Sequence, residues 1–490
     1  MIITTPIFDF INKYANDDIV RAHMPGHKGV CEGEGDFEKF YKYDITEIDE
    51  ELCLYGDEGI VAQSTDSAAM LFNAGKTFYS AEGASLAIKT MVAACKMEAC
   101  DVEKPVIMAA RNVHRSFLDA CALMDVEVIF IQEHKDSHFC KCELSPECLE
   151  KLLNVAVSEG LSERLIAVYV TSPDYLGNLQ DIKELAKVCK GYKKPLLVDN
   201  AHGAYLKFFN MHPMELGAAM CADSAHKTLP VLTGGAYIHI GKDYSKTYAK
   251  HCKKALNIFA STSPSFLISA SLDKCNAYLN ESGEKDYHKC AEKIDNLKER
   301  LKSFFKSEEI DSFIAIEDIK EPLKLTLSLE NYKGEEFSKR LRERKIAVEY
   351  ADREKVVFML SPFNRDEDYE RIYEAVKEII SCEGFLGNEI SNEEEKHSSY
   401  SYKELSVAKI QEDTNVKEQE IALKCIDVRR LYFSKSETVR VEDSIGKICV
   451  NTTVSCPPAV PIVVLGETIT EENVKIMQAY KIKTVEVLVS

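Results

Sequence analysis

The sequence predicts an α/β protein, in which helices cover both faces of a mostly parallel sheet and smaller α+β units follow. The first observation is the pattern between residues 60 and 260, where short apolar runs alternate with amphipathic helical segments. Such runs, bounded by turn residues, are typical of strands buried on both faces of a parallel sheet. The second observation is a change after residue 285, where a long charged helix precedes short strands. The chain has 490 residues, enough for several domains with a sizeable core.

The first part of the chain, residues 1–60, is predicted to be a loop-rich N-terminal segment. It contains RAHMPGHKG (21–29), whose Pro-Gly pair indicates a turn, and YDITEIDEE (43–51). The large domain is predicted over residues 61–284. We expect its helices at 66–75, 83–96, 114–124 and 181–192, and its strands at 76–80, 105–110, 126–132, 165–172 and 195–203.

A small α+β domain is predicted over residues 285–385. It begins with the charged helix DYHKCAEKIDNLKERLKSFF, and the apolar runs LKLTLSL and VVFMLS read as its strands. Residues 386–402 are polar, acidic and serine-rich, which indicates a linker. Residues 403–490 are predicted to form a C-terminal α+β domain that ends in a helix and a strand.

The composition narrows the class of function. The formal net charge of −19 argues against nucleic acid or an anionic membrane as the main partner. No apolar stretch is long enough to span a membrane and no signal peptide is visible, so we expect a cytoplasmic protein whose 17 cysteines are reduced. The one local cysteine cluster (His138, Cys140, Cys142 and Cys148) lacks the paired C-x-x-C of zinc sites, and no metal is expected.

Two residues indicate cofactor chemistry. Four apolar residues lead into Asp199, which places its carboxylate at the carboxyl end of a buried strand, where an isolated charge is costly. Lys227, in SAHKTLP, follows about one strand–helix step later and is expected at a neighbouring strand end. A lysine that binds an aldehyde and a carboxylate that pairs with a ring nitrogen suit pyridoxal 5'-phosphate. The alternative is that Asp199 caps its loop or forms a structural ion pair.

A bound phosphate needs several hydrogen-bond donors, and SAEGAS (80–85) can supply them. It follows a β-like run and opens a helix, so backbone N–H groups and a hydroxyl can face an anion. Ser and Gly are also ordinary N-cap residues, so this signal alone is weak. Ser224 offers a further hydroxyl, and His114, which follows an apolar strand, can stack on a cofactor ring.

The order of several motifs makes the signal specific. The chain resembles the Orn/Lys/Arg decarboxylases, which are pyridoxal-phosphate enzymes of the aspartate-aminotransferase fold (fold type I), in the short form without an N-terminal wing domain. The resemblance covers nearly the whole chain and implies a seven-stranded, mostly parallel sheet and a C-terminal decarboxylase domain. It is carried by HMPGHKG (23–29), DITEI (44–48), RNVHRS (111–116), VTSPDYLG (170–177), LLVDNAHGA (196–204), SAHKTLPVLT (224–233), STSPSFLISASLD (261–273) and PPAVPIVVLGE (457–467).

The resemblance implies a role for each matching residue. Lys227 binds the cofactor covalently, Asp199 pairs with the ring nitrogen, and His226 joins them in catalysis as a proton donor. His114 stacks on the ring, and Ala201 and His202 lie beside it. The phosphate is held by Gly83, Ala84, Ser85, Ser224 and His226, and in a neighbouring subunit by Thr262 and Ser263, so at least a homodimer is expected.

The sequence departs from the family pattern at several of these places. Glu82 and Ala84 stand in a phosphate loop that is usually N-G-[ST]-[ST], and Asn200 replaces the Glu of D-E-A-H. Asp174 stands where a Thr is usual, and Gly234 where a Gln is usual. These changes leave Lys227 and Asp199 in place.

The function implied is decarboxylation of arginine, lysine or ornithine to the amine, in connection with polyamine biosynthesis. The distal cation of such a substrate needs a carboxylate, and the candidates are Asp174, Glu47 and Glu82, each of which is at least as well explained as a surface or loop-capping residue. The alternatives are another reaction with the same cofactor, such as transamination, or a non-catalytic paralogue.

Overall fold

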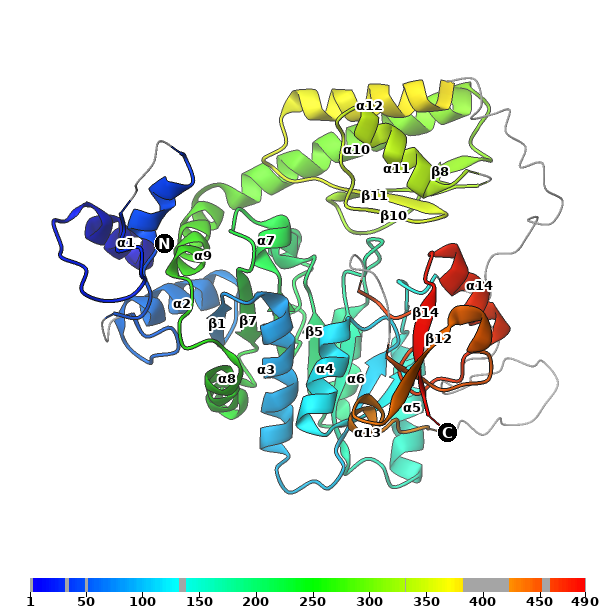
Figure 1. The fold of residues 1–490 in the computed structure, drawn as a ribbon, viewed down its shortest axis with the longest axis horizontal. Helices are drawn as coiled ribbons and strands as arrows, with labels where there is room; N and C mark the ends of the chain where they lie inside the picture. Colours follow the sequence, from blue (N-terminus) through cyan, green and yellow to red (C-terminus); the bar gives the residue numbers. More distant parts are fainter. Residues whose placement is uncertain are drawn as a thin grey trace.

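The computed structural model describes residues 3–30, 35–48, 52–131, 138–330, 332–381, 423–451 and 459–489. Figure 1 shows three sheets: a central one, a smaller one packed under long helices, and a third near the C-terminus. The N-terminal helix α1 (Pro6–Asn16) lies at the opposite side of the molecule from the C-terminal sheet (Figure 1).

The central sheet has seven strands in the order β1-β7-β6-β5-β4-β2-β3. The neighbours from β3 to β6 are all parallel, whereas β7 runs antiparallel to both β1 and β6. The predicted fold class, with its mostly parallel seven-stranded sheet, is therefore confirmed. The strands are β1 (Lys76–Ser80), β2 (Val106–Ala110), β3 (Glu127–Ile131), β4 (Leu165–Thr171), β5 (Leu196–Asp199), β6 (Met220–Asp223) and β7 (Ala236–Ile240).

Both faces of this sheet are buried, as the apolar runs predict. Along β2, Ile107 and Ala109 belong to one core cluster, whereas Val106, Met108 and Ala110 belong to another. Side chains alternate between the two faces of a strand, so the two clusters lie on opposite faces. The first cluster includes α3 (Gly83–Glu98), α4 (Arg115–Met124) and α8 (Ser245–Phe259), and the second includes α5 (Pro146–Ser158) and α6 (Ile182–Gly191).

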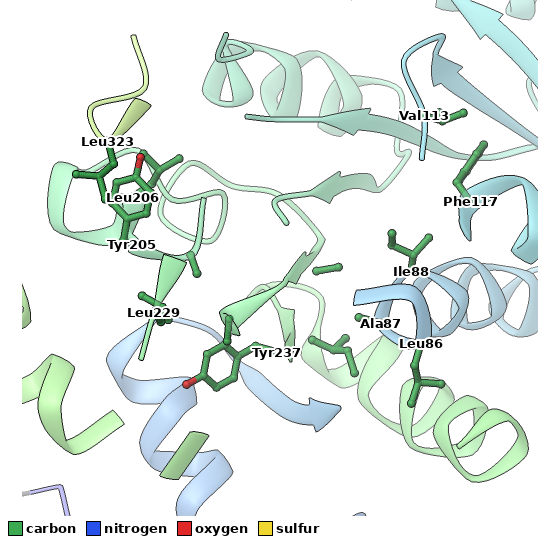
Figure 2. Packing of buried hydrophobic residues seen from close by; sticks show 14 of the residues in the cluster. Leu86, Ala87, Ile88, Val113, Phe117, Tyr205, Leu206, Leu229, Tyr237 and Leu323 are labelled. Atoms are coloured by element: carbon green, nitrogen blue, oxygen red, sulfur yellow. The ribbon is translucent and has the colours of Figure 1, made fainter. Parts of the chain in front are cut away.

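Figure 2 shows how the first cluster joins distant segments. Leu86, Ala87 and Ile88 of α3 lie near Phe117 of α4, and Ala87 is fully buried. Tyr205 belongs to the 3-10 helix η3 (Ala204–Phe209) and lies against Leu323, just before the smaller sheet (Figure 2). The smaller sheet therefore shares the core of the large one.

Further helices lie within the first 307 residues. One differs from its prediction, because α2 (Gly59–Leu71) begins well before residue 66. The polar run QSTDS does not suggest a buried helix, yet Ser64 is fully buried and hydrogen-bonds Tyr79 at 2.6 Å. The other elements are η1 (Glu38–Tyr43), α7 (Ala225–Thr228), α9 (Phe266–Tyr278), the π-helical turn η4 (Leu279–Gly283) and α10 (Glu284–Ser307).

The smaller sheet has the order β10-β11-β9-β8, and all of its neighbours are antiparallel. Helices α10, α11 and α12 pack over it (Figure 1). The elements are β8 (Ile314–Ile316), β9 (Lys324–Leu329), α11 (Gly334–Glu343), β10 (Tyr350–Ala351), β11 (Lys355–Met359) and α12 (Asp366–Ser381).

The C-terminal sheet has the order β12-β14-β13. The linker expected at 386–402 and the start of the C-terminal unit at 403 lie outside the described residues, and all of the domain boundaries stay predictions. The elements are α13 (Val428–Tyr432), β12 (Ser436–Arg440), η5 (Val441–Asp443), β13 (Cys449–Asn451), α14 (Glu471–Ala479) and β14 (Thr484–Leu488).

A buried ion pair fastens the C-terminal unit to the central sheet. Arg111, directly after β2, donates from Nη2 to Glu467 at 3.0 Å and from Nε to the same carboxylate at 3.3 Å. Its guanidinium also donates to the carbonyls of Pro461 and Ile462. Both charged side chains are at most 5% exposed. Two segments that carry the family resemblance are thus joined by one guanidinium.

Replacing Arg111 with leucine should lower the free energy of unfolding by roughly 3–5 kcal/mol, because Glu467 is left as an unpaired buried charge. Urea unfolding followed by circular dichroism measures the loss. The matched control is Arg365→Leu, which breaks an exposed pair with Asp368 and should leave the transition where it is. Equal effects of the two substitutions would contradict the structural role of Arg111.

Candidate functional site

Three parallel strands end side by side at one edge of the central sheet. In their register Thr171 of β4 pairs with Asp199 of β5, and Asp199 pairs with Ala222 of β6. This is the carboxyl edge of the sheet, where active sites of such folds are built. The side chains of Asp199 and Lys227 both lie here, as the sequence predicts.

Asp199 is a buried carboxylate with cations nearby. It is 2% exposed and accepts hydrogen bonds from the Tyr169 hydroxyl and the Ala201 main-chain N–H, both at 3.2 Å. Burial raises its pKa, whereas the charges of His114 and Lys227 oppose that rise. A carboxylate in this setting is suited to pairing with a buried cation.

Lys227 lies on the short helix α7 and contacts a buried imidazole. Its Nζ lies 3.0 Å from Nε2 of His202, which is 4% exposed. The pKa of His202 is well below its usual value, first because of burial and then because of the Lys227 charge. A neutral His202 accepts from the lysine at Nε2, and its Nδ1 has no hydrogen-bond partner among the described residues.

A main-chain hydrogen bond joins the lysine loop, residues 224–235, which carries Lys227, to the predicted phosphate loop, residues 80–85. His226 is half-buried, and its Nδ1 bonds the carbonyl of Gly235 at 3.1 Å. Burial is also the main cause of its lowered pKa. Beside it, the N–H of Gly83 donates to the carbonyl of Gly234 at 2.7 Å. Gly234, with φ 97°, follows a path that a glutamine would adopt only with strain.

The predicted phosphate loop leaves open space at its glycine. Gly83 has φ 73°, and no heavy atom lies within 4 Å of the place where a Cβ would stand. Ser80 shapes the turn, since its hydroxyl donates to the Gly83 carbonyl at 3.0 Å and accepts from the Glu82 N–H at 3.1 Å. Ala84 is buried, whereas Ser85 is exposed at the start of α3.

His114 is fixed by the helix that it precedes. It is the N-cap of α4, and its Nδ1 accepts from the Ser116 main-chain N–H at 3.1 Å. The Ser116 hydroxyl donates to that of Ser85 at 2.8 Å, which links His114 to the phosphate loop. Burial lowers the pKa of His114. Sequence reasoning missed Ser116, although the N-cap spacing in RNVHRS is a usable signal.

The other predicted cofactor residues lie around this edge. Ser224 is buried and Ala201 is half-buried. Thr262 and Ser263 are exposed on the segment between α8 and α9, whose Ser261 N–H donates to Glu82 at 2.7 Å. The carboxylate of Glu82 thus ties the phosphate loop to the segment predicted to reach a neighbouring subunit.

All three carboxylates proposed for a substrate cation cap loops. Asp174 is 2% exposed, and one of its oxygens accepts from three consecutive main-chain N–H groups at 2.9 Å each. Glu47 accepts from the Leu54 N–H at 2.7 Å, and Glu82 from Ser261. The loop-capping interpretation accounts for each of these carboxylates.

The smaller sheet contributes residues that sequence reasoning missed. Lys324 of β9 is fully buried and donates to the carbonyl of Asp174 at 3.1 Å. The ring of Tyr175 meets His202 edge-on at 4.9 Å between centroids, and its hydroxyl donates to Glu349 at 2.7 Å. In the sequence, Lys324 stands within an otherwise apolar run, which indicates an unusual environment. No local sequence pattern distinguishes Glu349.

The cysteine cluster holds no set of metal ligands among the described residues. His138 bonds Asp352 at 2.8 Å, and the Cys142 thiol donates to the Ile131 carbonyl at 3.4 Å. Within the described parts of the chain, one group of three ligand-type side chains comes together elsewhere: His212, Asp223 and His239. None of the described helices is long and apolar enough to cross a bilayer.

A family model described as Orn/Lys/Arg decarboxylase, major domain, matches residues 5–332. An arginine decarboxylase of Bacillus subtilis is 28% identical over 96% of this chain and 92% of its own length. An arginine decarboxylase of Halalkalibacterium halodurans is 27% identical over the same shares of the two chains. The sequence comparison thus extends beyond the major domain to nearly the full length.

Among solved structures, the lysine decarboxylase of Francisella novicida aligns with a TM-score of 0.76 at 16% identity, over 99% of this chain and 81% of that one. A NifS-like protein from Rickettsia africae aligns with a TM-score of 0.53 at 14% identity, over 78% of this chain and 97% of that one. At these identities the likeness concerns the fold alone.

Replacing Asp174 with alanine should lower the free energy of unfolding by roughly 1–3 kcal/mol, because three buried N–H groups lose their acceptor. Asp174→Asn keeps one side-chain oxygen and should lose less. Chemical denaturation of the three proteins measures the order. A substitution that leaves stability intact would contradict the loop-capping role.

Proposed function

This chain belongs to the Orn/Lys/Arg decarboxylase family, and from that premise we propose that it decarboxylates a basic L-amino acid with pyridoxal 5'-phosphate bound through Lys227. The observation that carries the proposal is the strand edge where the buried Asp199 carboxylate and the buried His202 imidazole lie close to the half-buried Lys227 amine. Titratable side chains with shifted pKa values that gather at the carboxyl edge of a parallel sheet are typical of a functional site.

The residues at this edge fit the cofactor. Asp199 lies buried with positive charge nearby, as a partner of a cationic ring nitrogen must. Gly83 leaves open space at a helix N-terminus, where a phosphate finds N–H donors. The Nδ1 of His202 is a buried polar atom with no partner among the described residues, and a polar group of a ligand would satisfy it.

Each residue then has a definite task. When bound, the cofactor ring accepts the electron pair released as the bond from Cα to the carboxylate breaks. Asp199 would hold a proton on the ring nitrogen, and His114 would face the ring. Lys227 would carry the aldehyde carbon, and His226 or the freed Lys227 would deliver a proton to Cα. Gly83, Ala84, Ser85, Ser224 and His226 would surround the phosphate.

For the substrate cation, we propose Glu349 in place of the three loop-capping carboxylates. Tyr175 and His202 link it to Lys227 through a chain of contacts, and it directly precedes β10 of the smaller sheet. Arginine is the first candidate substrate, because two relatives that match nearly the full length are named arginine decarboxylase. Lysine and ornithine are the next candidates.

Assembly and location follow from the same proposal. Thr262 and Ser263 are exposed and would reach the phosphate of a neighbouring subunit, so the active form would be at least a homodimer. The product amine would feed polyamine synthesis, in the cytoplasm.

The central test has two measurements. Purified protein with added cofactor should absorb near ~420 nm, as lysine-bound pyridoxal phosphate does, and Lys227→Ala should abolish the band. Carboxyl-labelled arginine, lysine and ornithine should then be assayed for release of labelled CO₂. A band without release from any of the three would favour transamination, and absence of a band would favour a non-catalytic paralogue.

Replacing Glu349 with glutamine should raise the KM for the basic amino acid roughly 10-fold or more, because a charge-assisted hydrogen bond is lost. The effect on kcat should be smaller. Steady-state kinetics with the best substrate from the panel measures both constants, and Glu343→Gln, at an exposed position of α11, is the control. A fall in kcat at constant KM would argue against this role.

A further inference from the structure

A buried polar cluster adjoins the segments that carry Asp199 and Lys227, the two residues proposed to bind the cofactor ring. Asn200, His212, Asp223 and His239 are all fully buried. Asp223 Oδ1 accepts from the Asn200 amide at 2.7 Å, and Oδ2 lies 2.9 Å from His212 Nε2 and 3.4 Å from His239 Nε2. Burying a polar side chain costs free energy unless it is hydrogen-bonded, so a cluster of four buried polar side chains requires an explanation.

Hydrogen bonds explain the cluster better than a metal. The Met214 main-chain N–H donates to His212 Nδ1 at 3.3 Å, which leaves the proton of that ring on Nε2, pointing at Asp223. A metal would need the bare Nε2 lone pair. Burial lowers the pKa of His239, whose Nδ1 bonds the Thr77 hydroxyl at 2.8 Å.

Asp223 accepts hydrogen bonds at both of its oxygens, at Oδ1 from the Asn200 amide and at Oδ2 from His212 Nε2–H. His212 and His239 hold its pKa well below the usual range even though burial raises it. Other groups near it are the Cys221 thiol on its own strand, 3.7 Å from Oδ1, and the Tyr237 hydroxyl on β7. Asp199 on β5 acts on Cys221, and Lys207 of η3 acts on His239. An ionised acceptor needs a donor at position 200, and the asparagine amide supplies it. A carboxylate there, as in the usual D-E-A-H, would face a second negative charge.

The bond joins the two segments that carry the cofactor residues. Asn200 directly follows Asp199, and its N–H donates to the Ala222 carbonyl at 3.0 Å. Asp223 directly precedes Ser224, where the lysine loop begins. Gly203 leaves room for the Asn200 amide, because a Cβ at residue 203 would collide with Asn200 Oδ1.

We propose that the Asn200–Asp223 hydrogen bond is a positioning device that sets the place of Asp199 relative to Lys227. This inference rests on the proposed function, because it assigns the two residues a task in holding cofactor groups. The side chains of Asn200 and Asp223 bond each other and His212 rather than Asp199 or Lys227, which makes them positioning residues. A displacement of about 1 Å between groups that act together costs up to 100-fold in rate.

The test exchanges the donor and the acceptor of the Asn200–Asp223 hydrogen bond and keeps side chains of nearly the same size. Asn200→Asp places two carboxylates face to face, and the double variant Asn200→Asp/Asp223→Asn restores one donor and one acceptor. In the double variant, the new amide at position 223 keeps its oxygen for His212 and turns its nitrogen toward the new carboxylate at position 200. Asn200→Ala removes the bond without adding charge and serves if Asn200→Asp does not fold. Val376→Ala, in the core of α12, is a destabilised control remote from the site.

The readouts separate positioning from stability. In holoenzyme with a full complement of cofactor, Asn200→Asp and Asn200→Ala should lower kcat roughly 10- to 100-fold at similar KM. Both should shift the pH titration of the absorbance band, because a moved Asp199 changes the charge on the cofactor ring. The double variant should recover both properties, and Val376→Ala should change neither. The instability of Asn200→Asp should grow as pH rises above about 4, where a second buried carboxylate must ionise.

Three results would overturn the inference. One is a pH titration and kcat in both single variants that match wild type. Another is a double variant as impaired as Asn200→Asp. The third is a stoichiometric transition metal in wild-type protein that is lost in His239→Ala. Absence of the absorbance band in wild type would defeat the proposed function itself and this inference with it, whereas a normal wild-type band with any of the three results defeats this inference alone.

Discussion

A carboxylate buried at the end of a strand persists only where cations and donors lie within reach, and Asp199 depends on that condition. Its partners come from four separate places: Tyr169 on β4, the Ala201 N–H, His114 before α4, and Lys227 on α7. These places meet because parallel strands end at one edge of the sheet. The electrostatics of the site are therefore a consequence of the sheet order, and a sheet with another order would leave Asp199 without its cations.

The departures from the family pattern become intelligible when their contacts are considered together. Asn200 supplies a donor to Asp223, and Asp174 supplies an acceptor to three N–H groups of its own loop. Glu82 supplies an acceptor to the Ser261 segment. Each of these three residues meets a local hydrogen-bonding need, so none of the three requires a change in the chemistry of Lys227. Glu82 remains the one that brings a negative charge near the predicted phosphate site.

The smaller sheet and the C-terminal unit contribute more to the site than their distance along the chain suggests. Lys324 fixes the loop that carries Tyr175, and Tyr175 in turn contacts both His202 and Glu349. Arg111 binds Glu467, 356 positions later, and lies in the same connection between β2 and α4 as His114. No local pattern marks these pairs, because each partner alone looks like an ordinary charged residue in an element or loop. Lys324 is the exception, since a lysine within an apolar strand already indicates a special environment.

The sequence by itself determined the alternation of strands and helices, the strand-end position of Asp199, the lysine of SAHKTLP and the helix start within SAEGAS. These are local features, and hydrophobic periodicity and turn residues report them directly. Only the tertiary structure decided that Asp174, Glu47 and Glu82 cap loops, that Ser116 links His114 to Ser85, and that Asn200 bonds Asp223. The physical reason is that a side chain's role depends on which donor, acceptor or charge faces it, and that partner is chosen by packing between segments far apart in the chain.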